Sequence, residues 1–344
     1  MVFFRADSNS QIASGHIMRC LSIAKKFESK GYDVTFLIAD ENSVSLLEDN
    51  GMSYRILHSR WYDLSDETEK VKEVLVEHPC SILFIDTYSV NRTYVDFLLP
   101  YAKICYLGSK KEYLGNLDCL INYSADIDYD FYKDNYSTDT LLLLGPEYAP
   151  LRDEFQYVPV CENEEVNGCS ILLTTGNTDQ YNCVYRILEA LTESSFFYKV
   201  AIKVVIGRMF EYTSEIRRFL TYNNISLLEN VTSMSSLMQS SNLAIAANGT
   251  TVYELVASHV PTISFAMVKE QIGSAQALSR LGIVEYVGEM FNEGDECIRN
   301  MMNKVGMYVL NPTKRFELAR SAYKVIDGKG CDKIVNEIKQ NIIK

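Results

Sequence analysis

Runs of consecutive apolar residues alternate along this chain with segments whose apolar residues recur every three or four positions. Such runs are typical of strands buried on both faces of a parallel sheet, and such spacing is typical of the helices that cover it. In the first half of the chain the pattern predicts strands at 2–5, 32–39, 53–58, 81–88, 103–107, 119–123 and 140–144, and helices at 15–29, 44–50, 67–78 and 91–101.

The same alternation begins again in the second half of the chain. Strands are predicted at 169–175, 199–207, 225–229, 243–247, 262–267 and 283–287, with helices at 180–192, 212–222, 233–240, 250–258, 272–281 and 293–309, and helical spacing returns at 313–342. Two successive series of strand–helix units predict an α/β fold with two doubly wound, Rossmann-like domains facing each other across a cleft.

The length of 344 residues also fits two domains. The polar segment 156–167 has neither a strand nor a helix period, which predicts a linker. We therefore expect one domain at 1–155, a second at 168–312, and C-terminal helices at 313–344. In bilobal folds of this kind such a helical segment often packs back across both lobes.

The composition narrows the class of partner. A formal net charge of −12 argues against nucleic acid or an anionic membrane surface, but it leaves room for a nucleotide, whose phosphates can be held by backbone N–H groups at a helix N-terminus. No apolar run approaches the length of a membrane span, and the first residues lack the apolar core of a signal peptide. Nine cysteines without C-x-x-C or zinc-ligand spacing indicate reduced, mostly buried thiols, so we expect a cytoplasmic protein.

The first strand-to-helix turn carries the most informative chemistry, because ligands of open α/β sheets bind beyond the carboxyl ends of the strands. Arg5 and Asp7 end the first strand, and Ser14, Gly15 and His16 open the first helix. Ser14 suits an N-cap, and Gly15 permits close approach of a ligand to the backbone. The positive end of the helix disfavours an imidazolium, so His16 is expected to be neutral and able to accept a proton. The alternative is an ordinary surface histidine.

Asp86 ends the apolar run SILFI, and Tyr88 follows two residues later. A carboxylate at this position is either a cleft residue or the N-cap of the next helix. The acidic, tyrosine-rich stretch 126–140 is expected to be a solvated loop rather than a sugar-binding platform.

Two turns of the second domain are candidates for nucleotide binding. In the first, Gly176 and Asn177 offer positive-φ positions and are followed by Thr178 and Asp179; the turn is suited to a phosphate or sugar, or is simply a tight turn.

The second turn follows the buried strand at 243–247 and opens a helix. Asn248 and Gly249 precede Thr250 and Thr251, whose hydroxyl and N–H groups suit a diphosphate, and Glu254 lies one turn further along, within reach of a ribose diol. The alternative is a capped core helix.

These segments together resemble the PseG-type nucleotide-sugar hydrolases of pseudaminic acid biosynthesis. The resemblance runs in order through RADSNSQIASGHIMRCL (5–21), FIDTY (84–88), LGPEYAPLRDEF (144–155), TGNTD (175–179), MSSLM (234–238), GTTVYE (249–254) and EQ (270–271). It covers most of residues 1–285.

The resemblance implies a GT-B fold and hydrolysis of UDP-2,4-diacetamido-2,4,6-trideoxy-β-L-altropyranose to the free sugar and UDP, without a metal or other cofactor. It implies that His16 is the general base, that residues 249–254 hold UDP and that Gln271 contacts the ligand. This chain departs from the family pattern at Ala13 and Asn177, where members usually have glycine, and at Thr87, where they usually have histidine. It also departs at Gly108–Ser109, near a usual pair of aspartates.

The leading hypothesis is therefore a UDP-sugar hydrolase. An inverting GT-B glycosyltransferase, in which His16 activates an acceptor hydroxyl, is the alternative, and a sugar-nucleotide-binding protein without catalysis is the third. The oligomeric state is left open. The predicted catalytic residues are His16, Asp86 and Tyr88, and the predicted nucleotide- and sugar-binding residues are Arg5, Asp7, Gly15, Gly176, Asn177, Thr178, Asp179, Asn248, Gly249, Thr250, Thr251, Glu254 and Gln271.

Overall fold

A computed structural model divides the chain into two compact units, Met1–Asp153 with Lys329–Lys344, and Glu154–Gly328. It describes all residues except Ser10, Ala13, Cys80, Tyr157, 159–168, Arg208, Tyr212 and Lys344. The predicted linker at 156–167 therefore lies outside the described residues, apart from Gln156 and Val158. No helix within the described part of the chain is long and apolar enough to cross a membrane.

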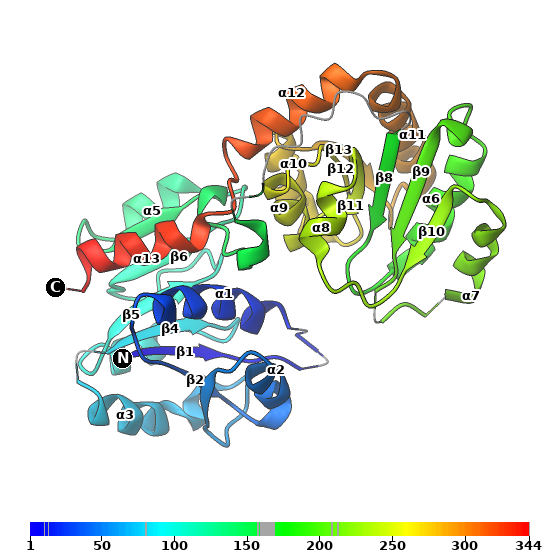
Figure 1. Cartoon of the computed structure of the whole chain (residues 1–344). Helices are drawn as coiled ribbons and strands as arrows, with labels where there is room; N and C mark the ends of the chain where they lie inside the picture. Colours follow the sequence, from blue (N-terminus) through cyan, green and yellow to red (C-terminus); the bar gives the residue numbers. More distant parts are fainter. Residues whose placement is uncertain are drawn as a thin grey trace. The chain divides into compact units, whose positions relative to one another are not determined.

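Among its described residues, the first unit forms a seven-stranded parallel sheet with the order β3-β2-β1-β4-β5-β6-β7 (Figure 1). The strands are β1 (Val2–Ala6), β2 (Val34–Ile38), β3 (Ser53–Ile56), β4 (Ile82–Asp86), β5 (Lys103–Leu107), β6 (Cys119–Asn122) and β7 (Leu141–Leu144). The chain reverses its direction of winding between β1 and β4, and this switch point is where doubly wound sheets bind their ligands.

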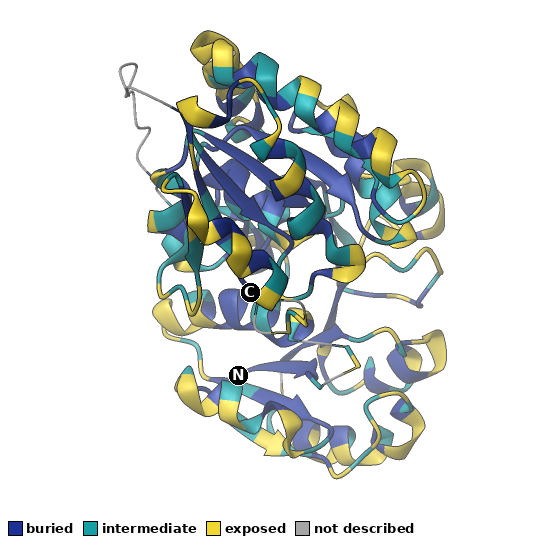
Figure 2. Ribbon diagram, turned by 90° about the vertical axis from the view of Figure 1, so that its right-hand side faces the viewer, coloured by how far each residue is buried: buried dark blue, intermediate teal, exposed yellow. Residues whose placement is uncertain are grey.

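Helices cover both faces of this sheet. They are α1 (Gly15–Ser29), α2 (Val44–Asp49), α3 (Thr68–Glu77), α4 (Arg92–Leu98), α5 (Tyr129–Asn135) and α13 (Gly330–Asn341). In Figure 2 most of the strands are buried and the outer faces of the helices are exposed. Helix α1 buries Ile17, Leu21, Ala24 and Phe27 against one face of the sheet, and α13 packs beside it through Ile334 and its neighbours.

The second unit repeats this plan. Its described residues form a six-stranded parallel sheet with the order β10-β9-β8-β11-β12-β13. The strands are β8 (Cys169–Thr174), β9 (Val200–Val205), β10 (Ile225–Leu228), β11 (Leu243–Ala247), β12 (Thr262–Ala266) and β13 (Glu285–Glu289). Here the direction of winding reverses between β8 and β11.

The helices of the second unit are α6 (Cys183–Thr192), α7 (Thr213–Ile216), α8 (Met234–Gln239), α9 (Thr250–Ala257), α10 (Ile272–Arg280), α11 (Gly294–Leu310) and α12 (Pro312–Tyr323). Helix α12 belongs to the second unit and α13 to the first. The helical segment predicted at 313–344 thus contributes one helix to each unit.

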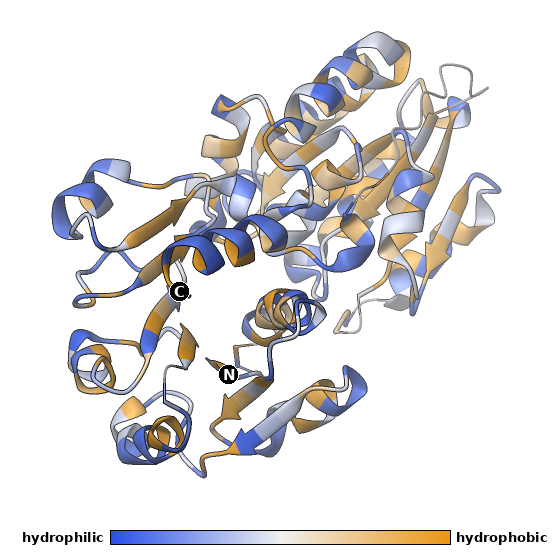
Figure 3. Ribbon diagram, turned by 60° about the vertical axis from the view of Figure 1, so that its left-hand side comes forward, coloured by the Kyte–Doolittle hydropathy of each residue, from blue (hydrophilic) through white to orange (hydrophobic). Residues whose placement is uncertain are grey.

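The central strands have the continuous apolar character that the sequence pattern indicated, whereas the edge strands β3 and β13 include polar residues. Figure 3 shows many of the strands as hydrophobic ribbons. Phe4, Phe36 and Phe84 stack across β1, β2 and β4 with ring centroids 4.6–5.2 Å apart. The seven cysteines within the described residues are buried, unpaired thiols.

The solvated loop predicted at 126–140 is wrong over its central part, which forms helix α5. Asp128 caps this helix by accepting a hydrogen bond from the Phe131 N–H at 3.0 Å. Tyr132 and Tyr136 face the core at helical spacing and are 2% and 6% exposed. These two tyrosines therefore serve packing, whereas Tyr129 is exposed, and the acidic composition of the stretch concealed the helical spacing.

Candidate active site

The candidate catalytic residues of the first unit lie at the switch point of its sheet. Strands β1 and β4 are neighbours, with Ala6 opposite Asp86 at their carboxyl ends, and helix α1 begins just beyond β1. Gly15 is the first residue of α1, and a Cβ there would meet nothing within 4 Å. Ser14 is the N-cap residue, but its side chain makes no capping hydrogen bond.

His16 and Asp86 form the centre of this site. His16 Nδ1 lies 2.5 Å from Asp86 Oδ1, and both residues are buried, at 4% and 1% exposure. Asp86 therefore pairs with His16 and does not cap the next helix; Asn91 caps α4 instead, accepting from the Tyr94 N–H. The arrangement joins a histidine at a helix start to a buried carboxylate at a strand end.

Arg19, one helical turn after His16, completes the cluster and is not among the residues predicted from the sequence. Its Nε donates to Asp86 Oδ2 at 2.5 Å, its Nη2 contacts Asp86 Oδ1, and its Nη1 donates to the Tyr123 hydroxyl at 3.2 Å. The three-residue spacing that places Arg19 on the same helix face as His16 was the available signal.

The positive charge of Arg19 offsets the negative charge of Asp86 in this cluster. Burial raises the pKa of Asp86, but the guanidinium of Arg19 and the hydrogen bonds from Arg19 and His16 outweigh it, and the pKa lies below its usual range. Burial and Asp86 raise the pKa of the Cys20 thiol, whose Sγ donates to Asp86 Oδ2 at 3.4 Å. Asp86 is therefore a carboxylate surrounded by donors.

Tyr88 lies at the exposed side of the cluster. Its ring stands edge-on to the His16 ring, at a centroid distance of 4.6 Å and an angle of 89°, while the residue is 71% exposed. The structure thus brings all three predicted catalytic residues together.

Arg5 and Asp7 do not fit their predicted binding role, because they lie inside the protein. Arg5 is fully buried and pairs with both carboxylate oxygens of Glu67, at 2.6 and 2.7 Å, and with Asp7. Asp7 also accepts from the Ala39 N–H at 2.7 Å, and the Tyr94 hydroxyl donates to Glu67 at 2.9 Å. These residues form a structural network that anchors the loop leading to His16.

In the second unit, the predicted diphosphate turn lies at the switch point between β8 and β11. Gly249 is the N-cap of α9 in an extended conformation, and a Cβ there would meet nothing within 4 Å. Gly249 and Thr250 are exposed, while Thr251 and Glu254 are partly exposed. The turn therefore presents the N-terminus of α9, with a carboxylate one turn along it.

Asn248 and Gln271 link this turn to the loop after β12. The buried Asn248 side chain donates to the Gln271 carbonyl at 3.3 Å and accepts from the Ser264 hydroxyl. Gln271 Oε1 in turn accepts from the Met267 N–H at 2.8 Å. The Asn248 side chain is thus buried and connects two loops by hydrogen bonds, and it does not face solvent where a nucleotide would bind.

The turn after β8 differs from its prediction at Asn177. Gly176 has a φ of +87°, as expected, but the positive-φ residues that follow are Tyr181 and Asn182, not Asn177. The Thr178 carbonyl accepts from the Thr175 hydroxyl, closing the turn. Asp179 accepts from the Val184 N–H at the start of α6, and burial raises its pKa to about 6.

One departure from the family pattern has a physical reason. A Cβ at Gly108 would lie 2.3 Å from the hydroxyl oxygen of Tyr106, which is buried beside it. An aspartate at this position would therefore require Tyr106 to move.

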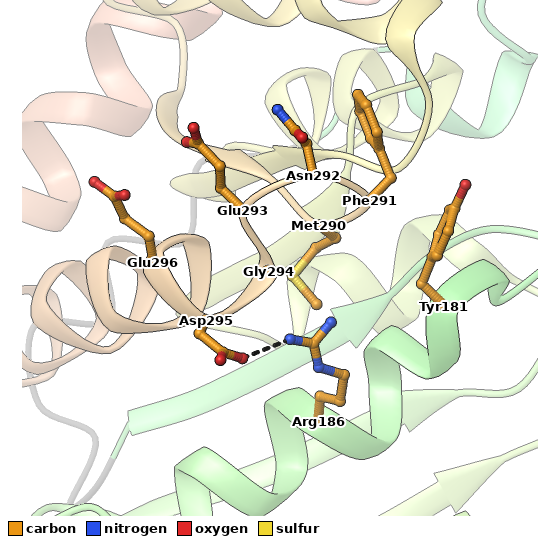
Figure 4. A pocket seen from close by; sticks show the side chains of 9 residues that line it. All are labelled: Tyr181, Arg186, Met290, Phe291, Asn292, Glu293, Gly294, Asp295 and Glu296. Atoms are coloured by element: carbon orange, nitrogen blue, oxygen red, sulfur yellow. Dashed lines mark hydrogen bonds and ion pairs between the residues drawn. The ribbon is translucent and has the colours of Figure 1, made fainter.

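A surface cavity of about 550 Å³ in the second unit contains no predicted catalytic or binding residue. Tyr181, Arg186 and residues 290–296 line it, and Arg186 pairs with Asp295 at 2.9 Å (Figure 4). Within the described residues, no group of three His, Cys, Asp or Glu side chains could hold a metal ion.

The two sheets and the switch-point sites define the fold class, a GT-B fold of two Rossmann-like domains. The chain is similar to MurG of Acinetobacter baumannii, with a TM-score of 0.70 and 13% identity, covering 98% of this chain and 99% of that one. It is also similar to HepE of Anabaena in complex with UDP-glucose, with a TM-score of 0.61 and 13% identity over 99% of this chain and the whole of that one.

Sequence comparison confirms the resemblance to PseG-type hydrolases, although no family model matches. The chain is 26% identical to the UDP-2,4-diacetamido-2,4,6-trideoxy-β-L-altropyranose hydrolase of Campylobacter jejuni, covering 83% of this chain and 98% of that protein. It is 23% identical to an uncharacterised protein of Methanocaldococcus jannaschii and 22% identical to the spore coat polysaccharide biosynthesis protein SpsG of Bacillus subtilis. These matches cover 96% and 58% of this chain, but only 64% and 56% of the two relatives' lengths.

Proposed function

We propose that the protein is an enzyme that hydrolyses a UDP-sugar, releasing UDP and a free 2,4-diacetamido-2,4,6-trideoxy hexose. The observation that carries this proposal is the buried His16–Asp86 pair at the start of α1, with Nδ1 and Oδ1 2.5 Å apart. The name of the Campylobacter jejuni relative supplies the substrate class.

In this reaction His16 is the general base. Asp86 accepts the Nδ1 proton, so Nε2 carries the lone pair that removes a proton from water. The water oxygen forms a bond to the anomeric carbon as the bond from that carbon to the phosphate oxygen breaks. UDP departs with the electron pair and needs little protonation, because its charge is spread over the diphosphate.

The second unit supplies the nucleotide site in this proposal. The N–H groups at the start of α9 and the hydroxyls of Thr250 and Thr251 bind the diphosphate, and Glu254 binds the ribose diol. Gln271 and the turn at 176–178 lie in loops at the carboxyl ends of the same sheet and contact the sugar nucleotide.

We place the reaction in the cytoplasm, in keeping with the buried thiols, and on a route to a nonulosonic acid or a related polysaccharide building block. A transferase with the same fold would use His16 in the same way, but with an acceptor hydroxyl in place of water. The two functions therefore differ in one observable, the release of UDP when water is the only nucleophile present.

The experiment measures UDP release from UDP-2,4-diacetamido-2,4,6-trideoxy-β-L-altropyranose, without an acceptor, for the wild type and for His16→Asn. Release by the wild type, and its loss in His16→Asn with UDP affinity within a few-fold, is the expected result. His58→Asn is the matched control, because His58 lies beyond β3 and outside the cluster. Tight UDP binding without release would contradict hydrolysis and favour the transferase.

A further inference from the structure

His16 and Arg19 both contact the Asp86 carboxylate, and they have opposite effects on the protonation of the site. His16 approaches Oδ1 through Nδ1 at 2.5 Å, and Arg19 occupies both oxygens, with Nε 2.5 Å from Oδ2. A carboxylate held only by a histidine would draw a second proton onto the imidazole ring. A histidine that carries both protons has no lone pair and cannot act as a base.

Arg19 also lies directly beside the imidazole ring. Its Nη2 is 3.0 Å from His16 Nδ1. A guanidinium only donates hydrogen bonds and a carboxylate only accepts them, so the proton between Nδ1 and Oδ1 belongs to the histidine. Arg19 therefore makes no hydrogen bond to Nδ1–H, and its positive charge opposes a second proton on the ring.

We propose that Arg19 is a positioning residue that neutralises Asp86, so that Asp86 fixes the His16 tautomer without converting the ring to an imidazolium. This inference rests on the proposed role of His16 as a base. In this role Arg19 acts through Asp86: Nε and Nη2 contact Asp86, and Nη1 donates to the Tyr123 hydroxyl.

The groups around the His16–Asp86 pair favour this assignment. They comprise residues of α1, the end of β4, β5 and the end of β6, namely Arg19, Cys20, Tyr88, Tyr106 and Tyr123. The Cys20 thiol and Tyr106 hydroxyl have pKa values raised by burial and stay neutral at pH 7. Among these groups, Arg19 is the cation that offsets Asp86.

The first test compares Arg19→Met with the wild type in UDP release across pH. Loss of the guanidinium leaves Asp86 uncompensated, so the pair takes up its next proton at a higher pH. The acidic limb of kcat/KM should move up by about one pH unit. At pH 7, kcat should fall by up to about 10-fold, while KM and UDP affinity stay within about threefold.

A matched control removes another paired cation from the same helix. Lys26 lies on α1 and pairs with Asp332 of α13 at 3.1 Å, away from the site. Lys26→Met should have the same pH profile of kcat/KM as the wild type. An unchanged profile in Arg19→Met, or a loss of UDP affinity with kcat intact, would overturn the positioning role.

Chemical rescue tests the same point without relying on the fold of one variant. The Arg19 side chain is 21% exposed, so removing it opens a space that solvent reaches. Millimolar guanidinium chloride should restore part of the activity of Arg19→Ala, and equal sodium chloride should not. Arg19→Lys retains the charge but loses the two-point contact, and should show a smaller pH shift than Arg19→Met.

Nitrogen NMR of the histidine rings separates this inference from the proposed function. The chain has four histidines, so His16→Asn identifies the His16 signals. We expect the wild-type ring to carry its proton on Nδ1, and its pH titration to move upward in Arg19→Met. That result would support the role of Arg19 even if the wild type failed to hydrolyse the sugar nucleotide. A proton on Nε2 in the wild type, or a titration unchanged in Arg19→Met, would overturn it.

Discussion

Replacing Asp86 with asparagine tests the core of the site. An asparagine amide has nearly the same shape, so the change removes the charge while preserving the packing. It can present either an oxygen or an N–H to His16 Nδ1, and the second orientation places the ring proton on Nε2, the atom that must be free to act as a base. Loss of an orienting carboxylate costs about 10⁴-fold in kcat, the decrease we expect.

The same substitution should also destabilise the fold. It leaves the Arg19 guanidinium, which is 21% exposed, with the Tyr123 hydroxyl but no opposite charge. Breaking a buried pair costs about 3–5 kcal/mol, and the partial exposure of Arg19 places the expected loss near 3 kcal/mol. Urea unfolding measures this loss, and UDP release measures kcat.

The pH dependence of that stability difference is fixed by the direction of the Asp86 pKa. A carboxyl whose pKa is lower in the folded chain than in the unfolded chain stabilises the fold above the unfolded value, and this contribution is lost as pH falls through the folded value. The wild type should therefore exceed Asp86→Asn by the full amount above about pH 4, and by less in more acidic solution.

Asp96→Asn is the matched control for this prediction. It makes the same chemical change at an exposed i,i+4 pair with Arg92 on α4. This variant should keep both wild-type activity and wild-type stability. A kcat for Asp86→Asn within threefold of the wild type would refute the orienting role of Asp86.

Four further predictions follow from other residues. Glu254→Ala should weaken UDP binding by about 1–3 kcal/mol in calorimetry, and unchanged binding would exclude the ribose contact. Glu67→Gln should lower the free energy of unfolding by about 3 kcal/mol or more, because it leaves the fully buried Arg5 short of one charge; a loss under 1 kcal/mol would contradict the network. Burial raises the pKa of Asp179 to about 6. The protonated carboxyl is therefore compatible with the fold in acid, and the fold loses free energy of unfolding as the pH rises from the unfolded pKa through 6. Asp179→Asn should therefore match the wild type in stability near pH 3 and exceed it by about 3 kcal/mol at pH 8, and the opposite trend would refute the assignment. EDTA should leave UDP release unchanged, whereas a loss rescued by Mg²⁺ would show a metal requirement.

The sequence pattern predicted both sheets because their central strands are buried on two faces and are therefore continuously apolar. It also placed α1 at 15–29, where the structure has Gly15–Ser29. It missed α5 because the apolar contribution there comes from tyrosines, which in an acidic context look like surface residues.

The site was only partly predictable for a reason of topology. His16 and Asp86 are 70 residues apart, and their contact depends on β1 and β4 being neighbours, which local pattern does not encode. Arg5 looked like a ligand-facing cation because its partner Glu67 lies 62 residues away. Arg19 lay within the quoted motif, but its role became visible only with Asp86 in place.

The most direct measurement of the central claim is a single turnover in water enriched in ¹⁸O, followed by the mass of the UDP released. Attack of water on the anomeric carbon breaks the bond between carbon and oxygen, so the account predicts that UDP contains no ¹⁸O and that the label enters the sugar. UDP carrying one ¹⁸O would mean that water attacks phosphorus instead, and it would contradict the assignment of His16 as the base for attack on the sugar.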